Sequence, residues 1–88
     1  MLCKRFKVTG LVQGVWFRQS TKNTAQSLSL TGWVSNMADG SVELVACGDE
    51  VQLDKLTDWL QDGPPAAKVN SVSSENIPLE PYSEFRVK

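Results

Sequence analysis

Two kinds of hydrophobic periodicity alternate along this chain, and their order limits the possible folds more than any other feature. Residues 2–9 alternate between two faces, with Phe6 and Val8 on the apolar one, as in a half-buried strand. From about residue 17 to residue 28, apolar or small side chains recur at helical spacing instead. The first part of the chain therefore predicts a strand, a loop and an amphipathic helix.

The rest of the chain continues this alternation. Residues 30–36 form a second apolar stretch, and an Asp-Gly turn separates it from a third predicted strand over residues 42–47. A second helix is predicted over residues 49–62, because acidic residues open it and a Gly-Pro-Pro sequence ends it. We expect a fourth strand over residues 67–72 and a short fifth strand over residues 85–88.

The predicted element order is βαββαβ with one strand added, which is the split βαβ order of the ferredoxin-like α+β fold. In that fold, two helices pack on one face of a mainly antiparallel sheet. The 88 residues, 41% of them apolar, suit a single domain over residues 1–88. In the usual strand order, 4-1-3-2, the first two strands are parallel, so we expect Gly10 and Asn36 to be neighbours at one end of the sheet.

A loop with two glycines joins the first strand to the first helix. Gly10 and Gly14 allow a tight turn and a close approach to a ligand. The helix would direct its unpaired N–H groups at this loop, which suits an anion such as phosphate. Arg18 lies in the first turn, where a cation is unfavourable unless an anion lies beside it, and its side chain should lean toward the loop. An ordinary turn beside a solvated arginine is the alternative interpretation.

Asn36 ends the second predicted strand and would adjoin this loop. Its side-chain amide offers both a donor and an acceptor, so it can hold a water molecule in a fixed orientation beside a bound phosphate. A polar residue that begins the turn toward Asp39 and Gly40 is an equally simple interpretation.

Two segments resemble the signatures of the acylphosphatase family: GLVQGVWFR at residues 10–18 and GWVSNMADGSVELVACG at residues 32–48. The resemblance implies metal-independent hydrolysis of acyl phosphates to a carboxylate and inorganic phosphate, without a cofactor. It also implies that Arg18 and Asn36 are catalytic, and that the phosphate-binding loop consists of Gln13, Gly14, Val15, Trp16, Phe17 and Arg18. Two serines depart from the family pattern. Many members have glycine in place of Ser29, and a longer side chain is common in place of Ser35.

A non-catalytic regulatory module that binds an anion through the same loop is the alternative function, and it would not need Asn36. An RNA-binding module is disfavoured, because it would display paired aromatic residues on the central strands. Those strands carry Arg5, Lys7, Glu43 and Val45 instead. Core or pocket-wall roles are favoured over base stacking for the three tryptophans, which are Trp16, Trp33 and Trp59.

Charge and hydropathy limit the partners. The formal net charge is −1, so no overall field would attract nucleic acid, and the longest apolar runs are too short to cross a membrane. The first residues contain no secretory apolar region. We therefore expect a small-molecule substrate, no nucleic-acid or membrane partner, and a monomer in the cytoplasm.

The two cysteines allow a geometric prediction. If Lys7 lies opposite Glu43 across the first and third strands, Cys3 lies opposite Cys47 on the same exposed face of the sheet. A disulfide is then possible. Two reduced thiols are nevertheless favoured, because disulfides are rare in the cytosol.

Overall fold

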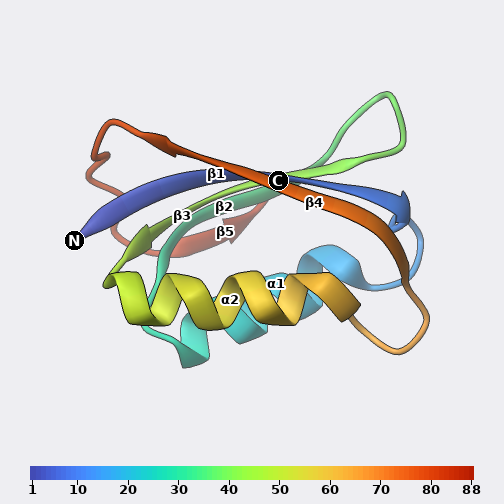
Figure 1. Cartoon of the computed structure of the whole chain (residues 1–88), viewed down its shortest axis with the longest axis horizontal. Coiled ribbons are helices and arrows are strands. Elements are labelled where there is room, and N and C mark those ends of the chain that lie inside the picture. Colours follow the sequence, from blue (N-terminus) through green and yellow to red (C-terminus); the bar gives the residue numbers. More distant parts are fainter.

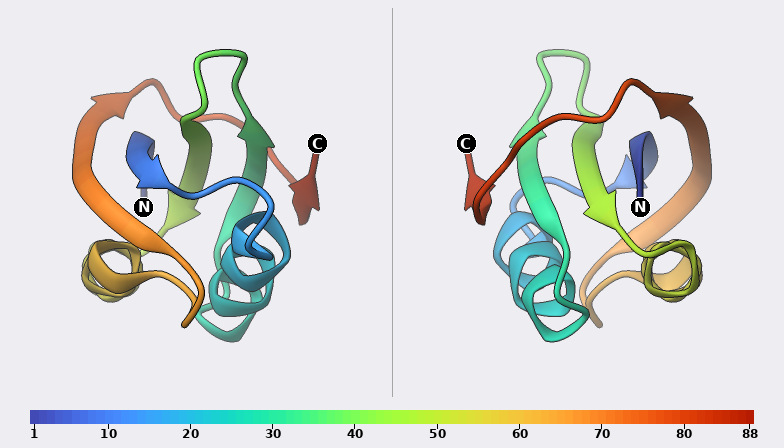
Figure 2. Two further views of the ribbon diagram at one scale, coloured as in Figure 1. Left: turned by 90° about the vertical axis from the view of Figure 1, so that its right-hand side faces the viewer. Right: turned by 90° about the vertical axis from the view of Figure 1, so that its left-hand side faces the viewer.

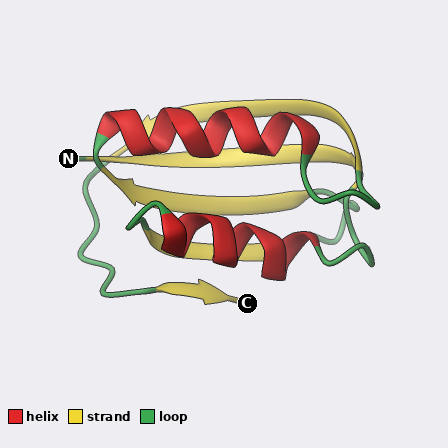
Figure 3. Cartoon of the chain, turned by 90° about the horizontal axis from the view of Figure 1, so that it is seen from below, coloured by secondary structure: helices red, strands yellow, loops and turns green.

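Two helices cover one face of a five-stranded sheet in the computed structural model, which describes residues 1–88 (Figures 1 and 3). The elements follow the predicted βαββαβ order, with one added strand. In chain order they are β1 (Leu2–Leu11), α1 (Phe17–Ser27), β2 (Thr31–Asn36), β3 (Val42–Gly48), α2 (Glu50–Asp62), β4 (Lys68–Ile77) and β5 (Phe85–Val87). No helix has the length and apolar character needed to span a bilayer.

The strand order in the sheet is β4-β1-β3-β2-β5, which confirms the predicted order of the first four strands. β3 is antiparallel to both β1 and β2, so β1 and β2 run in the same direction. Their C-terminal ends therefore emerge together, at the right-hand side of Figure 1, where α1 also begins. β5 adds to the free edge of β2 and is parallel to it.

β4 is longer than predicted. It runs to Ile77, and its last residues pair with the start of β1, where Cys3 lies opposite Ile77. β4 is an edge strand whose side chains are mostly exposed, and residues 73–76 are all polar. The alternation of apolar residues that marks a half-buried strand is therefore absent from this segment, although its backbone forms the ladder.

The main core lies between the helices and the sheet. α1 buries Phe17, Thr21 and Ala25, and α2 buries a stripe of leucines. Full burial of each large apolar side chain contributes about 1.5–3 kcal/mol. This core therefore holds the start of α1 firmly against the sheet. The largest fully buried side chains include Phe6, Phe17, Leu44, Leu53, Leu56 and Leu60.

The opposite face of the sheet carries a disulfide. The predicted register is confirmed, with Lys7 opposite Glu43 and Cys3 opposite Cys47. The favoured reduced state is not what the structure has, because the two sulfur atoms are bonded. The predicted exposure of these cysteines is wrong, since Cys3 and Cys47 are only 2% and 3% exposed.

The segment between β4 and β5 explains this burial, because it crosses the sheet on the side away from the helices (Figure 2). Tyr82 from this segment packs against the cysteine cluster and accepts a hydrogen bond from Trp33 Nε1 at 3.1 Å. The main-chain N–H of Glu80 donates to Cys3 Sγ at 3.3 Å. The sequence does not indicate this cover, because the segment has no regular periodicity.

Candidate active site

The loop between β1 and α1 leaves a run of backbone donors without partners in the protein. No main-chain N–H of residues 13–18 donates a hydrogen bond to a protein acceptor. Two residues of this loop have left-handed backbone conformations, Gly14 with φ 72° and Trp16 with φ 64°. Left-handed residues before a helix orient successive N–H groups toward a common ligand, and a helix N-terminus favours an anion. The phosphate site that the sequence predicts would need unpartnered donors of this kind.

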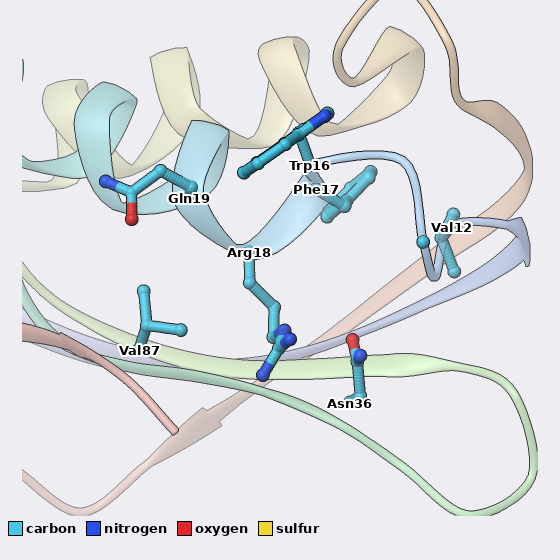
Figure 4. A pocket seen from close by; sticks show the side chains of 8 residues that line it. Val12, Trp16, Phe17, Arg18, Gln19, Asn36 and Val87 are labelled. Atoms are coloured by element: carbon cyan, nitrogen blue, oxygen red, sulfur yellow. The ribbon is translucent and has the colours of Figure 1, made fainter.

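A pocket of about 410 Å³ opens between this loop and the sheet (Figure 4). Arg18 and Asn36 both line it. This proximity is expected, because the parallel strands β1 and β2 end at the same edge of the sheet. Gly14, Trp16 and Phe17 of the predicted loop also line it. Val12, Gln19 and Val87 complete the lining and were not foreseen as site residues.

Two residues of the predicted phosphate-binding loop do not line the pocket. Val15 packs against the main core. The Gln13 side chain instead donates from Nε2 to the main-chain oxygen of Met37 at 2.8 Å and to that of Ser41 at 2.9 Å. Gln13 thus joins the loop to the turn that follows Asn36. Its side chain stabilises the position of the loop but does not line the pocket.

Arg18 is the one charged side chain in the pocket lining. It extends from the first turn of α1 toward the sheet, where its guanidinium lies beside Asn36 (Figure 4). Its Nη1 donates to the main-chain oxygen of Lys88 at 2.8 Å. A guanidinium has five N–H donors, so this bond fixes the side chain and leaves other donors for a ligand. Arg18 lies beside the loop, as predicted. It also contacts Lys88, directly after β5, and the sequence did not indicate this contact.

Asn36 carries an unsatisfied acceptor. Its Oδ1 is buried and has no hydrogen-bond partner in the structure. Buried polar atoms in proteins are nearly always paired, and an unpaired one destabilises the fold by about 1–3 kcal/mol. This acceptor belongs to a side chain that points into the pocket (Figure 4). A ligand or an ordered water molecule at this point would satisfy it.

The fold and the pocket together define a small ferredoxin-like α+β domain with a pocket lined by Arg18 and Asn36 at one end of its sheet. The acylphosphatase family model matches residues 4–87. The chain is 51% identical over 86 residues to an acylphosphatase of Coxiella burnetii, covering 98% of this chain and 90% of that protein. It is 50% identical to an acylphosphatase of Legionella pneumophila, covering 98% of this chain and 94% of that protein.

Two solved structures agree with this finding. An acylphosphatase from Coxiella burnetii superposes with a TM-score of 0.96 at 50% identity, covering 99% of this chain and 92% of that one. An acylphosphatase from Bacillus subtilis gives a TM-score of 0.97 at 37% identity, covering 100% of this chain and 99% of that one. The chain belongs to the acylphosphatase family. The predicted family, enzyme class and fold are thereby confirmed.

Proposed function

We propose that this chain hydrolyses acyl phosphates, with the phosphoryl group held by the backbone N–H groups of residues 13–18 and by Arg18, and the attacking water held by Asn36. One observation carries the proposal. Unpartnered main-chain donors, one guanidinium and one buried unpaired amide oxygen belong to residues around a single pocket. These are the groups needed to bind a phosphoryl group and to orient a water molecule.

The donors stabilise the charge of the phosphoryl oxygens. Donors that are already positioned for the transition state need no rearrangement during the reaction, so they lower the barrier effectively. The guanidinium of Arg18 is planar and matches two phosphoryl oxygens at once. Its bond to the oxygen of Lys88 keeps it in place before substrate binds.

Asn36 supplies the acceptor for water. A water molecule that donates one hydrogen to Asn36 Oδ1 presents its oxygen lone pairs to the phosphorus atom. As the water oxygen forms its bond to phosphorus, the bond to the acyl oxygen breaks, and the carboxylate leaves with the bonding electron pair. The proton released by the water passes to a phosphoryl oxygen. The pocket lining contains no carboxylate or histidine to accept it.

We also propose that the reaction needs neither a metal nor a strong general acid. The leaving group is a carboxylate, a weak base that departs without protonation. Positive charge at the phosphoryl group comes from Arg18.

The first experiment follows the hydrolysis of benzoyl phosphate at neutral pH with a chelator present. We expect rapid hydrolysis by the parent, and a loss of about a hundredfold or more in turnover for Asn36→Ala, typical of removing a group that acts in the transition state. Asn36→Ala should still bind inorganic phosphate as a competitive inhibitor. Arg18→Ala should lose both the hydrolysis of benzoyl phosphate and the binding of inorganic phosphate. The exposed Asn70 and the ion-paired Arg86 provide the controls Asn70→Ala and Arg86→Ala.

This experiment separates the enzyme from the regulatory module. A module that only binds anions would not hydrolyse benzoyl phosphate, and its phosphate affinity would be unaffected by Asn36→Ala. The alternative has no independent support, because the relatives described above are named as enzymes. Near-normal turnover in Arg18→Ala would overturn the mechanism.

The monomeric state and the cytoplasmic location stay predictions. The exposed, polar side chains of edge strand β4 are typical of strands that resist pairing with another chain. The disulfide is unusual for a reducing compartment. Light scattering of the purified protein tests the first prediction, and fractionation of cells tests the second.

A further inference from the structure

Trp16 is the most exposed of the three tryptophans, and it has no role in the core. Its side chain is 80% exposed. Trp59, in contrast, packs its ring against Phe17 with a centroid separation of 5.8 Å, and Trp33 is half-buried and hydrogen-bonded to Tyr82. The stability of the fold therefore does not explain the large apolar side chain at position 16.

The backbone at this position also disfavours tryptophan. Trp16 has φ 64° and occupies the N-cap of α1. Left-handed backbone is unfavourable for a bulky residue and is adopted readily by glycine. Helix N-caps favour short polar side chains that bond to the backbone, and Trp16 makes no such bond. Two local preferences are thus violated in order to place an indole ring here, a pattern that is typical of functional sites.

The ring lies where a substrate would extend from its phosphoryl group. Arg18 and Asn36 lie together on one side of the pocket, and Trp16 and Val87 provide apolar surface away from them, beside the polar side chain of Gln19 (Figure 4). Val87 belongs to β5 and is 38% exposed. A second groove, between α1 and β5, shares Val87 and Gln19 with this pocket, so the two adjoin on this side.

We propose that Trp16 and Val87 form the subsite for the acyl group, and that this subsite favours acyl phosphates with a planar, apolar acyl group. This inference rests on the proposed function, because it assumes that the phosphoryl group lies against Arg18. An aromatic acyl group would stack on the indole and remove apolar surface from water, whereas an acetyl group is too small to cover the ring.

Matched substrates and variants test the subsite. The ratio of kcat/KM for benzoyl phosphate to that for acetyl phosphate measures differential binding of the acyl group in the transition state. We expect Trp16→Gly to lower this ratio about tenfold, as for the loss of one aromatic stacking contact. Trp16→Phe should retain most of the preference, because it keeps an aromatic face.

Two controls make the result specific. Trp33→Phe alters a tryptophan on the opposite face of the sheet and should leave the ratio unchanged. The unfolding temperature of Trp16→Gly should not fall, because glycine suits the backbone at this position. Any general loosening of the phosphate-binding loop by glycine would affect both substrates equally and cancel in the ratio.

The outcomes are separable. If Trp16→Gly leaves the ratio unchanged, by lowering both rates equally or neither, the acyl subsite is wrong while the proposed function stands. If Trp16→Phe loses the preference as fully as glycine does, aromatic stacking is wrong. If the folded parent hydrolyses neither substrate, the proposed function itself fails and the subsite fails with it.

Discussion

Gln13 and Met37, which come from opposite sides of the site, are joined by a hydrogen bond of 2.8 Å from Gln13 Nε2 to the main-chain oxygen of Met37. The same nitrogen donates to the main-chain oxygen of Ser41 at 2.9 Å. Asn36 directly precedes Met37 in the chain. One side chain therefore couples the position of the loop before α1 to the position of the proposed water-binding residue.

Gln13→Ala should lower turnover more than it lowers substrate binding. The backbone donors and Arg18 are unchanged by this substitution, whereas the turn that carries Asn36 loses its link to the loop. Misplacement of a catalytic group by about 1 Å reduces the rate up to about a hundredfold, so we expect kcat to fall about tenfold or more with little change in KM. Steady-state kinetics with benzoyl phosphate measure both constants.

The control for this substitution is Gln61→Ala. Gln61 is exposed, and its side chain bonds only within α2. It should leave kcat unchanged. A Gln13→Ala enzyme with the parent kcat would show that the bridge has no part in positioning Asn36.

The meeting of Arg18 with Asn36 could be predicted from the sequence, whereas the bridge of Gln13 could not. The meeting follows from element order alone, because β1 and β2 both pair with β3 and so end together. The bridge uses main-chain oxygens, which every residue carries, so no pattern of residue types marks it. Val87 was missed for a related reason, since three residues of β5 are too few to show a period.

The register of β1 against β3 could be predicted from the sequence, but the ion pairs across these strands could not. The register that places Cys3 opposite Cys47 was predicted correctly from charge pairing between Lys7 and Glu43. The actual ion pairs differ, because Glu43 contacts the diagonal neighbour Arg5 at 3.3 Å and Lys7 contacts Asp39 at 3.1 Å. Long side chains reach several partners near a given backbone register, so register is more predictable than contact.

The Cys3–Cys47 disulfide should make stability depend on redox state. It closes a sequence separation of 44 residues, for which the loss of unfolded-chain entropy stabilises the fold by about 2–4 kcal/mol. Reduction should therefore lower the unfolding midpoint in urea. The Cys3→Ser, Cys47→Ser double variant should show the lower midpoint with or without reductant.

Mass spectrometry tests the bridge directly. The purified protein should gain the mass of two hydrogen atoms on reduction, as each sulfur becomes a thiol. Reductant should act slowly until denaturant is added, because both sulfur-bearing residues are buried. Absence of a mass difference in the native protein would contradict the disulfide.

Ser29→Gly should stabilise the protein. Ser29 follows the end of α1 with φ 58°. The N–H of Leu30 donates to the Ala25 oxygen at 2.9 Å, and that of Ser29 donates to the Gln26 oxygen at 3.0 Å. This is the Schellman pattern, in which glycine is strongly preferred at the left-handed position. Relief of the backbone strain should exceed the entropy that glycine adds to the unfolded chain, for a net gain of about 0.5–1 kcal/mol.

Ser27→Gly is the matched control, because Ser27 is an exposed residue within the last turn of the same helix. Glycine there should destabilise the fold by about 0.5–1 kcal/mol. Urea denaturation of the two variants should thus shift in opposite directions. A fall in stability for both variants would mean that the left-handed conformation of Ser29 carries no strain.

Asp39 should contribute stability that disappears in acid. Hydrogen bonds from the side chain and main chain of Ser41, followed by the contact with the Lys7 ammonium, hold the pKa of Asp39 well below its usual range. A carboxyl whose pKa is lower in the folded state stabilises the fold above its unfolded pKa, which is about 3.9. That contribution is lost as the pH falls from about 4 through the folded pKa.

Asp39→Asn should therefore lower the unfolding temperature at pH 7, and its difference from the parent should shrink progressively below about pH 4. The exposed Asp54, which makes no ion pair, provides the control Asp54→Asn, whose unfolding temperature should stay near that of the parent. A deficit in Asp39→Asn that persists undiminished down to about pH 2 would show that the carboxylate charge is not its source.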